Sequence, residues 1–129
     1  MELPGTDRIT SLLTTFLDVQ SRRAQVVASN VANAETPGYR AKDLDFADFL
    51  KQAAGEAVAP SQPGAPQAML ADSPQVIEQT GAAVGMDGNT VDLGHEMSTL
   101  SETGMQYLTG TQLLQSRFRI LRTAINEGK

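Results

Sequence analysis

The sequence has no cysteine and no tryptophan, and aromatic residues make up only 5% of its 129 positions. The absence of cysteine excludes thiol catalysis, disulfide bonds and cysteine-based metal sites. So few aromatic side chains are a thin basis for the compact core of an enzyme. Basic residues are in the minority, 10 against 15 acidic ones, and the formal net charge of −5 argues against a general nucleic-acid-binding surface.

Long hydrophobic runs are missing as well. No window approaches the roughly 20 apolar residues that a helix needs to cross a bilayer, so we expect no direct membrane insertion. The N-terminal stretch lacks a basic leader followed by an unbroken apolar core and a small-residue cleavage site. We therefore expect a soluble chain without a cleavable signal peptide, which would leave the cytoplasm only by another export route.

What the sequence does contain is a seven-residue repeat near each end. We expect a helix over residues 6–34, with Thr6 or Asp7 as its N-cap. Small or apolar side chains recur along it in alternating steps of four and three residues, the pattern of a coiled-coil seam. This N-terminal seam consists of Leu13, Leu17, Ala24, Val27 and Val31, with Gln20 in its one polar position and Ala34 at its end.

The C-terminal part of the chain repeats the pattern. From Leu93 the steps are again four and three, and Asp92 stands where it can cap the helix. At about 1.5 Å per residue, such a helix extends roughly 50 Å, which is too long for a small globule. The C-terminal seam consists of Leu93, Met97, Leu100, Tyr107, Leu114, Phe118, Leu121 and Ile125, with Gly104 and Thr111 as its small members.

The region between the repeats has a different composition, rich in Ala, Pro, Gly, Gln and Ser. It cannot bury enough apolar surface to offset its ordering entropy, although "PQVIEQTG" is compatible with a short strand and Asp87-Gly88-Asn89 predicts a turn. We expect a mainly α fold, with long N- and C-terminal helices packed as a coiled-coil-like pair and an extended or partly disordered middle. The expected segments are an N-terminal helix (1–35), a helix-exit corner with an outgoing segment (36–50), a flexible connector (51–88) and a C-terminal helix (89–129).

Two such helices cannot cover both wide apolar stripes by pairing only with each other. The small seam residues permit a close approach of the helices but bury little apolar area; they are Ala24, Ala34, Gly104 and Thr111. At about 25 cal/mol per Å² of apolar area removed from water, a lone hairpin is marginal once conformational entropy is counted. We therefore expect the two seams to pack against neighbouring subunits, and the protein to become ordered on assembly.

The stretch "SNVANAETPGYRAKDLDF" ends the first helix with a dense motif. Proline removes a backbone donor and forces an extended residue before it, and Gly38 can adopt a positive φ. Tyr39 has a flat apolar body and a hydroxyl with which to wedge the corner against a helix. The two asparagines can bind freed carbonyls locally, or backbone groups of an adjacent subunit. The motif consists of Asn30, Asn33, Thr36, Pro37, Gly38 and Tyr39.

This motif closely resembles the signature of the bacterial flagellar rod, hook and hook-associated axial proteins, in which Asn-x-x-Asn is followed by Thr-Pro-Gly-Tyr. The short length, the "DLDF" after the motif and the "DGNTVDL" before the last helix are similar to the proximal rod members of that family. The resemblance covers residues 12–49 and 86–125. The middle of the chain has no recognisable match.

The resemblance implies a structural subunit of the proximal rod, in the basal body of the flagellum. Such a subunit assembles helically through its terminal helices and transmits torque across the periplasm, so it serves flagellum-dependent motility. The implied partners are copies of itself, other rod proteins of the FlgC type, a junction protein of the FliE type and the flagellar type III export machinery. The implied export route needs no cleavable signal peptide, and neither a cofactor nor a metal is expected.

A soluble helical adaptor or regulatory module, which binds a partner helix with the same apolar stripe, is the alternative. An enzyme is not expected, because a hydrolytic Ser/His/Asp set needs a shaped pocket and an oxyanion hole. The sole histidine, His95, fits a solvated helix surface better. A group of acidic residues after the corner has three interpretations: a metal cluster, a solvated face, or partners for Arg22, Arg23 or Arg117 of a neighbouring subunit. The group consists of Asp43, Asp45 and Asp48.

Overall fold

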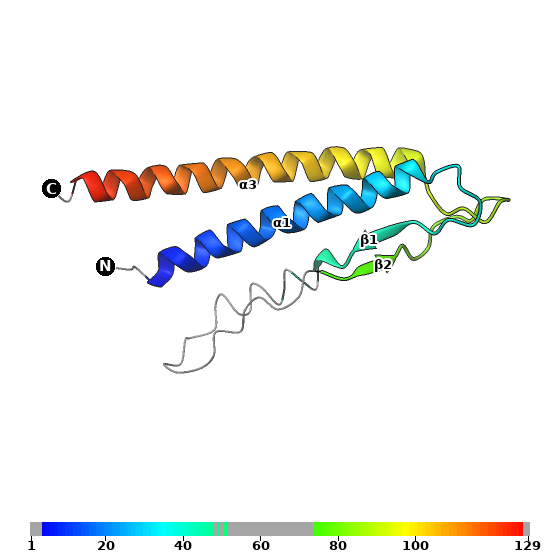
Figure 1. Cartoon of the computed structure of the whole chain (residues 1–129), viewed down its shortest axis with the longest axis horizontal. Coiled ribbons are helices and arrows are strands. Elements are labelled where there is room, and N and C mark those ends of the chain that lie inside the picture. Colours follow the sequence, from blue (N-terminus) through cyan, green and yellow to red (C-terminus); the bar gives the residue numbers. More distant parts are fainter. Residues whose placement is uncertain (1–3, 48, 50, 52–73, 128–129) are drawn as a thin grey trace, which may run out of the picture.

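Two long antiparallel helices dominate the computed structural model, which describes residues 4–47, 49, 51 and 74–127. Helix α1 spans Pro4–Ala32 and helix α3 spans Leu93–Glu127. They lie side by side near the corner and separate toward the two chain termini (Figure 1). The prediction of a mainly α fold built on a pair of long helices is therefore confirmed.

The helix ends follow from local chemistry. Helix α1 begins at Pro4, two residues before the expected start, where a proline loses nothing because the first N–H groups of a helix have no partner. Thr6 and Asp7 lie inside the helix, so the prediction that one of them is its N-cap is wrong. Helix α3 begins directly after Asp92, whose Oδ1 accepts a hydrogen bond of 3.1 Å from the backbone N–H of His95. Asp92 thus caps α3, as the sequence predicts.

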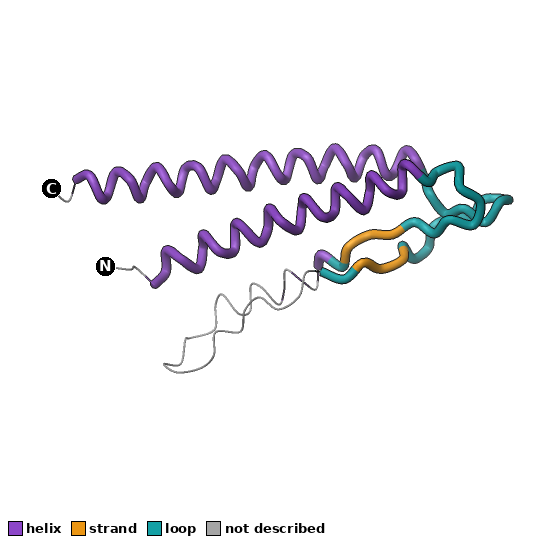
Figure 2. The backbone as a smooth tube through the Cα atoms, viewed as in Figure 1, coloured by secondary structure: helices purple, strands orange, loops and turns teal. Residues whose placement is uncertain are grey.

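A two-stranded arm lies along α1 (Figure 2). Strand β1 (Lys42–Leu44) pairs antiparallel with strand β2 (Val76–Glu78), and Asp43 stands opposite Ile77. The β2 strand falls within the stretch that is compatible with a short strand. Most of the expected connector, residues 52–73, lies outside the described residues.

The arm is held to α1 by a small apolar contact. Ala41 and Leu44 are buried, and the rings of Phe16 and Phe46 lie 6.2 Å apart at a tilted angle. Aromatic pairs at this separation and tilt are favourable. The start of the outgoing segment is thereby fixed against α1 rather than extended into solvent.

Buried polar side chains are as prominent in this fold as apolar ones. Among the described residues, the buried apolar side chains include Val19, Val27, Ala41 and Leu44. The buried polar or charged side chains are Gln20, Asn30, Asn89, Thr90, Glu96, Thr99 and Thr103. Because a buried polar group without a partner is costly, these contacts restrict the pair to one arrangement.

The two predicted seams have different environments. The N-terminal seam is buried or half-buried along α1, whereas α3 buries a polar stripe made of Glu96, Thr99 and Thr103. This stripe lies one position before the apolar members of the C-terminal seam, so it occupies the neighbouring side of the helix. The large apolar members that stay exposed are Leu93, Met97, Tyr107, Phe118 and Ile125, with exposed fractions from 44% to 70%.

Close approach of the two helices occurs at a different glycine from the one that the repeat indicates. A Cβ atom at Gly110 would lie 2.9 Å from Cδ2 of Leu17 and 3.1 Å from the ring of Phe16, so only glycine fits without movement. Gly104 is exposed, and a Cβ there would meet nothing within 4 Å. The expectation that Gly104 permits close approach of α1 and α3 is therefore wrong, because it lies on the outer seam.

Among the described residues, neither helix has a stretch that is long and apolar enough to span a bilayer.

Candidate functional site

The corner joins two stretches of sequence that lie about fifty positions apart. Gly38 has a φ of +74°, and its N–H donates to the carbonyl of Asp87 over 2.9 Å. The N–H of Thr90 donates to the carbonyl of Tyr39 over 3.0 Å. Gly88 has a φ of +81°, and a Cβ atom there would lie 3.5 Å from the Cα of Gly38. The Thr-Pro-Gly-Tyr motif and the turn before α3 thus form one unit.

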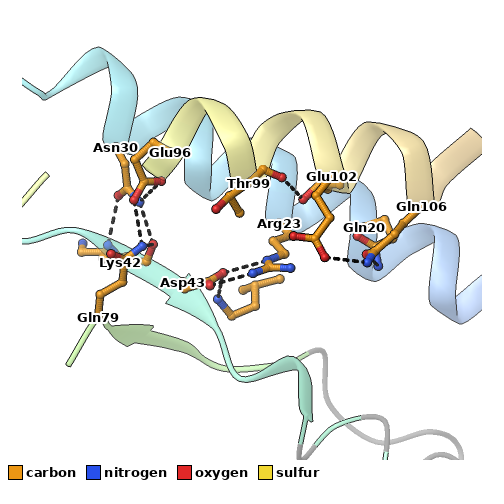
Figure 3. Close-up of polar contacts among 12 residues, drawn as sticks. Gln20, Arg23, Asn30, Lys42, Asp43, Gln79, Glu96, Thr99, Glu102 and Gln106 are labelled. Atoms are coloured by element: carbon orange, nitrogen blue, oxygen red, sulfur yellow. Dashed lines mark hydrogen bonds and ion pairs between the residues drawn. The ribbon is translucent and has the colours of Figure 1, made fainter. Parts of the chain in front are cut away.

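Asn30 is the centre of a buried polar cluster (Figure 3). Its amide donates to the carbonyl of Lys42 over 2.7 Å and to Oε2 of Glu96 over 2.9 Å, and its Oδ1 accepts from the N–H of Lys42 over 3.0 Å. Gln79 donates to Oε1 of the same Glu96 over 2.8 Å. A single asparagine thereby joins α1, β1 and α3. The sequence left open whether Asn30 binds local carbonyls or backbone groups of an adjacent subunit. In the structure it binds both backbone groups of Lys42, in its own chain.

The second motif asparagine caps α1 locally. The side-chain amide of Asn33 donates to the carbonyl of Ser29 over 2.8 Å, and the backbone N–H of Asn33 donates to the same carbonyl over 3.1 Å. The carbonyls of the turn that follows α1 bind Asn89, whose amide lies 2.9 Å from the oxygen of Asn33, 3.0 Å from that of Ala34 and 2.8 Å from that of Thr36. Sequence reasoning placed Asn89 in a turn and missed this role.

Tyr39 folds back onto the last turns of α1. Its hydroxyl lies 3.3 Å from Oδ1 of Asn30 and 3.3 Å from Oγ of Ser29. The next residue but one, Ala41, is buried, and its N–H donates to Oγ1 of Thr90 over 2.8 Å. The chain therefore leaves α1 at a fixed angle, because side-chain and backbone contacts hold both sides of the corner.

The acidic residues after the corner do not act as one group, because Asp43 pairs with an arginine of α1. Arg23 forms two hydrogen bonds with Asp43, of 3.1 and 3.0 Å, and both side chains are half-buried. The interpretation of Arg23 and Asp43 as partners across a subunit boundary is therefore wrong, since they pair within one chain. Asp48 lies outside the described residues, and no cluster of three potential metal ligands occurs among the residues that are described.

Three polar contacts join α1 to α3 at regular intervals of ten residues on α1, or about 15 Å. The amide of Gln20 is fully buried at the middle contact, and its Oε1 is buried without a hydrogen-bond partner. Contacts of this kind fix how far one helix is shifted along the other. They join Arg117 to Thr10 (3.3 Å), Gln20 to Gln106 (2.8 Å) and Asn30 to Glu96 (2.9 Å).

The exposed part of the C-terminal seam is the second candidate surface. It runs along the side of α3 that borders the buried polar stripe, from Leu93 to Ile125. Another apolar surface lies on the opposite side of α3, where a groove of about 900 Å³ is lined by both helices and by Phe49. Exposed apolar area of this extent on a small helical pair is typical of a protein that packs against others.

The histidine that could suggest catalysis has an ordinary helix environment. His95 is exposed on the first turn of α3, and Ser98 is exposed on the next. The nearby carboxylate of Asp92 is engaged as the helix cap. These residues therefore lack the buried, mutually bonded arrangement that a nucleophile and its base require.

Known proteins match the sequence at the corner and over most of the chain. Residues 17–40 match a family described as "Flagella basal body rod protein". The chain is 30% identical over 122 residues to the flagellar basal body rod protein FlgB of Salmonella typhimurium, a match that covers 87% of this chain and 88% of the relative. FlgB of Escherichia coli gives the same identity and coverage, and FlgB of Aeromonas hydrophila is 33% identical over 114 residues, covering 84% and 86% of the two chains.

Fold, corner and sequence together define a structural protein of the flagellar basal body rod, and the chain belongs to this rod protein family. Within the family it belongs with the FlgB proteins. Its function is that of a structural rod subunit, which serves motility, and its relatives are not enzymes. The interpretation as a soluble adaptor is not favoured.

Proposed function

We propose that this chain builds the proximal part of the rod by packing the exposed C-terminal seam of α3 against other subunits. The observation that carries this proposal is the exposure of the seam in the single chain. Met97 is 52% exposed, Phe118 54% and Ile125 70%. Covering such side chains is worth roughly 25 cal/mol for each Å² of apolar area removed from water, and a neighbouring subunit would supply this cover.

The corner supports this proposal in a different way. Its buried contacts hold the end of α1, the outgoing segment and the start of α3 as one unit, so residues 1–35 and 89–129 can act together as the core of the subunit. A rod that transmits torque needs subunits whose parts do not move independently. The motif residues Asn30, Asn33, Gly38 and Tyr39 then act within the subunit, and the seam acts between subunits.

The partners in this proposal are copies of the same chain, other rod proteins of the FlgC type and a junction protein of the FliE type. The chain would reach the periplasm through the flagellar type III export machinery. It would cross the export channel in an unfolded form. Rod assembly then supplies the contacts that the isolated helix pair lacks.

Replacing Leu114 or Phe118 by aspartate tests the proposal. A charge on the seam would have to be buried in the assembly, so we expect loss of rod assembly and of swimming, while the variant subunit is still exported. Measurements are swimming in soft agar, electron microscopy of isolated basal bodies, and the amount of subunit outside the cytoplasm.

Ile120→Asp is the matched control. Ile120 is 66% exposed, but it lies two positions from Phe118 and therefore about 200° around the helix. We expect cells with this control to keep more motility than cells with Phe118→Asp. Normal swimming of the Leu114 and Phe118 variants would show that the seam is not the subunit interface.

A further inference from the structure

The two-stranded arm turns one edge toward α1 and the other edge away from it. Strand β1 lies on the inner side, because both backbone groups of Lys42 bond to the side chain of Asn30, over 2.7 and 3.0 Å. Further along β1, the N–H of Leu44 donates to Oδ1 of Asp43 over 2.8 Å. Strand β2 lies on the outer side of the arm (Figure 1). The inner edge of the arm is therefore occupied by groups of its own chain.

The hydrogen bonds between the two strands show which way the backbone of β2 points. The N–H of Gln79 donates to the carbonyl of Ala41 over 2.9 Å, and the N–H of Asp45 donates to the carbonyl of Gln75 over 3.0 Å. In an antiparallel pair, such bonded residues alternate with residues whose N–H and C=O point outward. The backbone groups of Ile77, midway between Gln75 and Gln79, therefore point toward β1, and those of its two neighbours point away from it.

The outer edge of β2 is free. It carries the N–H and C=O of Val76 and Glu78, and no hydrogen bond reaches these groups within the part of the chain that the structure describes. The side chains along the edge are also exposed, Val76 by 54% and Ile77 by 45%. Proteins protect an unused edge with lysine, proline or a bulge, and residues 75–79 contain none of these. The edge is thus open to an added strand.

Another copy of the same chain does not fit this edge in a rod. Among the described residues, the β1 edge of each copy is covered by Asn30, so a second copy could offer only its own β2. Pairing β2 with β2 uses the same surface on both copies and closes as a dimer. In a rod built as proposed, the copies point in one direction, and a contact that reverses one of them cannot recur along it.

We infer that the outer edge of β2 binds an extended segment of a different protein, which adds a third strand to the arm. Main-chain hydrogen bonds with Val76 and Glu78 supply affinity, and side chains supply specificity. The segment that fits has a β-branched or aromatic residue beside Ile77 and a basic residue beside Glu78, because cross-strand pairs of these kinds are favourable. The inference rests on the proposed function and adds a second surface, through which the chain recognises a dissimilar partner.

Amide hydrogen exchange distinguishes a free edge from a paired one. Isolated basal bodies and the purified chain are compared at three neighbouring positions, Val76, Ile77 and Glu78. In the basal bodies we expect slow exchange at all three, because the added strand bonds the outward N–H groups. Slow exchange at Ile77 with fast exchange at both neighbours is the pattern of a free edge and would overturn the inference. Slow exchange at all three in the purified chain would also overturn it, because the chain would then cover its own edge.

A proline substitution removes an outward donor and leaves the inner ladder intact. Glu78→Pro lacks the N–H that points away from β1, and an edge strand tolerates proline at such a position. We expect the purified variant to unfold like the parent chain, and its amount in isolated basal bodies to fall several-fold. Glu78→Ala keeps the N–H and should keep most of the incorporation. Ile77→Pro is the matched variant, which loses an inner N–H and should loosen the arm itself. Normal incorporation of Glu78→Pro would contradict the inference.

Cross-linking identifies the kind of partner. A photo-reactive amino acid is placed at Val76 in motile cells, and the products are analysed in isolated basal bodies. We expect a product that joins this chain to a different protein, that persists with Glu78→Ala and that is lost with Glu78→Pro. A product of two copies of this chain would overturn the choice of partner, and a product that Glu78→Pro leaves unchanged would exclude strand pairing. Failure of the proposed seam has a separate sign, since Phe118→Asp cells would then swim normally.

Discussion

Helices α1 and α3 carry the same kind of seven-residue repeat, yet the structure uses the two repeats differently. The repeat of α1 packs inside the subunit, and its member Val27 is fully buried. The repeat of α3 lies mostly in solvent, while a polar stripe with Glu96 and Thr103 faces α1. A heptad repeat therefore predicts that a helix will pack, but it does not say whether the partner belongs to the same chain.

Polar side chains decide this difference. Gln20 and Asn30 interrupt the inner side of α1, and each needs a partner across the interface. Helix α3 supplies these partners only if its polar stripe turns inward, which carries the apolar seam outward. Leaving one of these polar groups buried without a partner would cost about 1–3 kcal/mol, which favours the arrangement in which both find partners on α3.

The largest expected effect contrasts the two repeats directly. Val27→Asp places a charge in a fully buried position and should lower the free energy of unfolding of the isolated chain by about 4 kcal/mol or more. Phe118→Asp should change it by less than about 0.5 kcal/mol, because Phe118 is exposed. Urea unfolding followed by circular dichroism measures both. Equal losses in the two variants would mean that the seams do not differ as described.

A smaller effect is expected at the polar cluster that turns α3. Asn30→Ala removes hydrogen bonds to Glu96 and to both backbone groups of Lys42, so stability should fall by about 3 kcal/mol. Hydrogen exchange at the N–H of Lys42 should also become faster. Asn33→Ala is the control, since it loses contacts at the helix end and should cost about 1 kcal/mol. A loss at Asn33 as large as that at Asn30 would argue against the cluster as the main determinant.

Two of the glycines of α3, Gly110 and Gly104, provide the finest comparison. Gly110→Leu must push against Leu17 and Phe16 and should cost about 1–3 kcal/mol. Gly104→Leu meets open space, and because leucine favours helix over glycine it should raise stability by up to about 1 kcal/mol. Thermal unfolding of both purified variants shows whether each substitution raises or lowers stability. Destabilisation by Gly104→Leu would place that residue inside the pair.

Much of the architecture could be predicted from local signals. The start of α3 follows from Asp92 and the apolar period after it, and the end of α1 follows from Pro37 shortly beyond it. The positive φ of Gly38 is also a local property of the motif. What remained hidden were contacts between distant positions, such as Asn89 with the end of α1 and Arg23 with Asp43.

The sequence by itself determined two long helices, the start of α3 and the sharp corner after α1, because these depend on hydrogen bonds and backbone freedom within a few residues. Only the tertiary structure decided which side of α3 faces α1. That choice depends on Gln20 and Asn30 finding partners 86 and 66 positions away, and a periodic pattern carries no information on such pairings. The outward seam, on which the proposed assembly depends, is a consequence of those buried polar contacts.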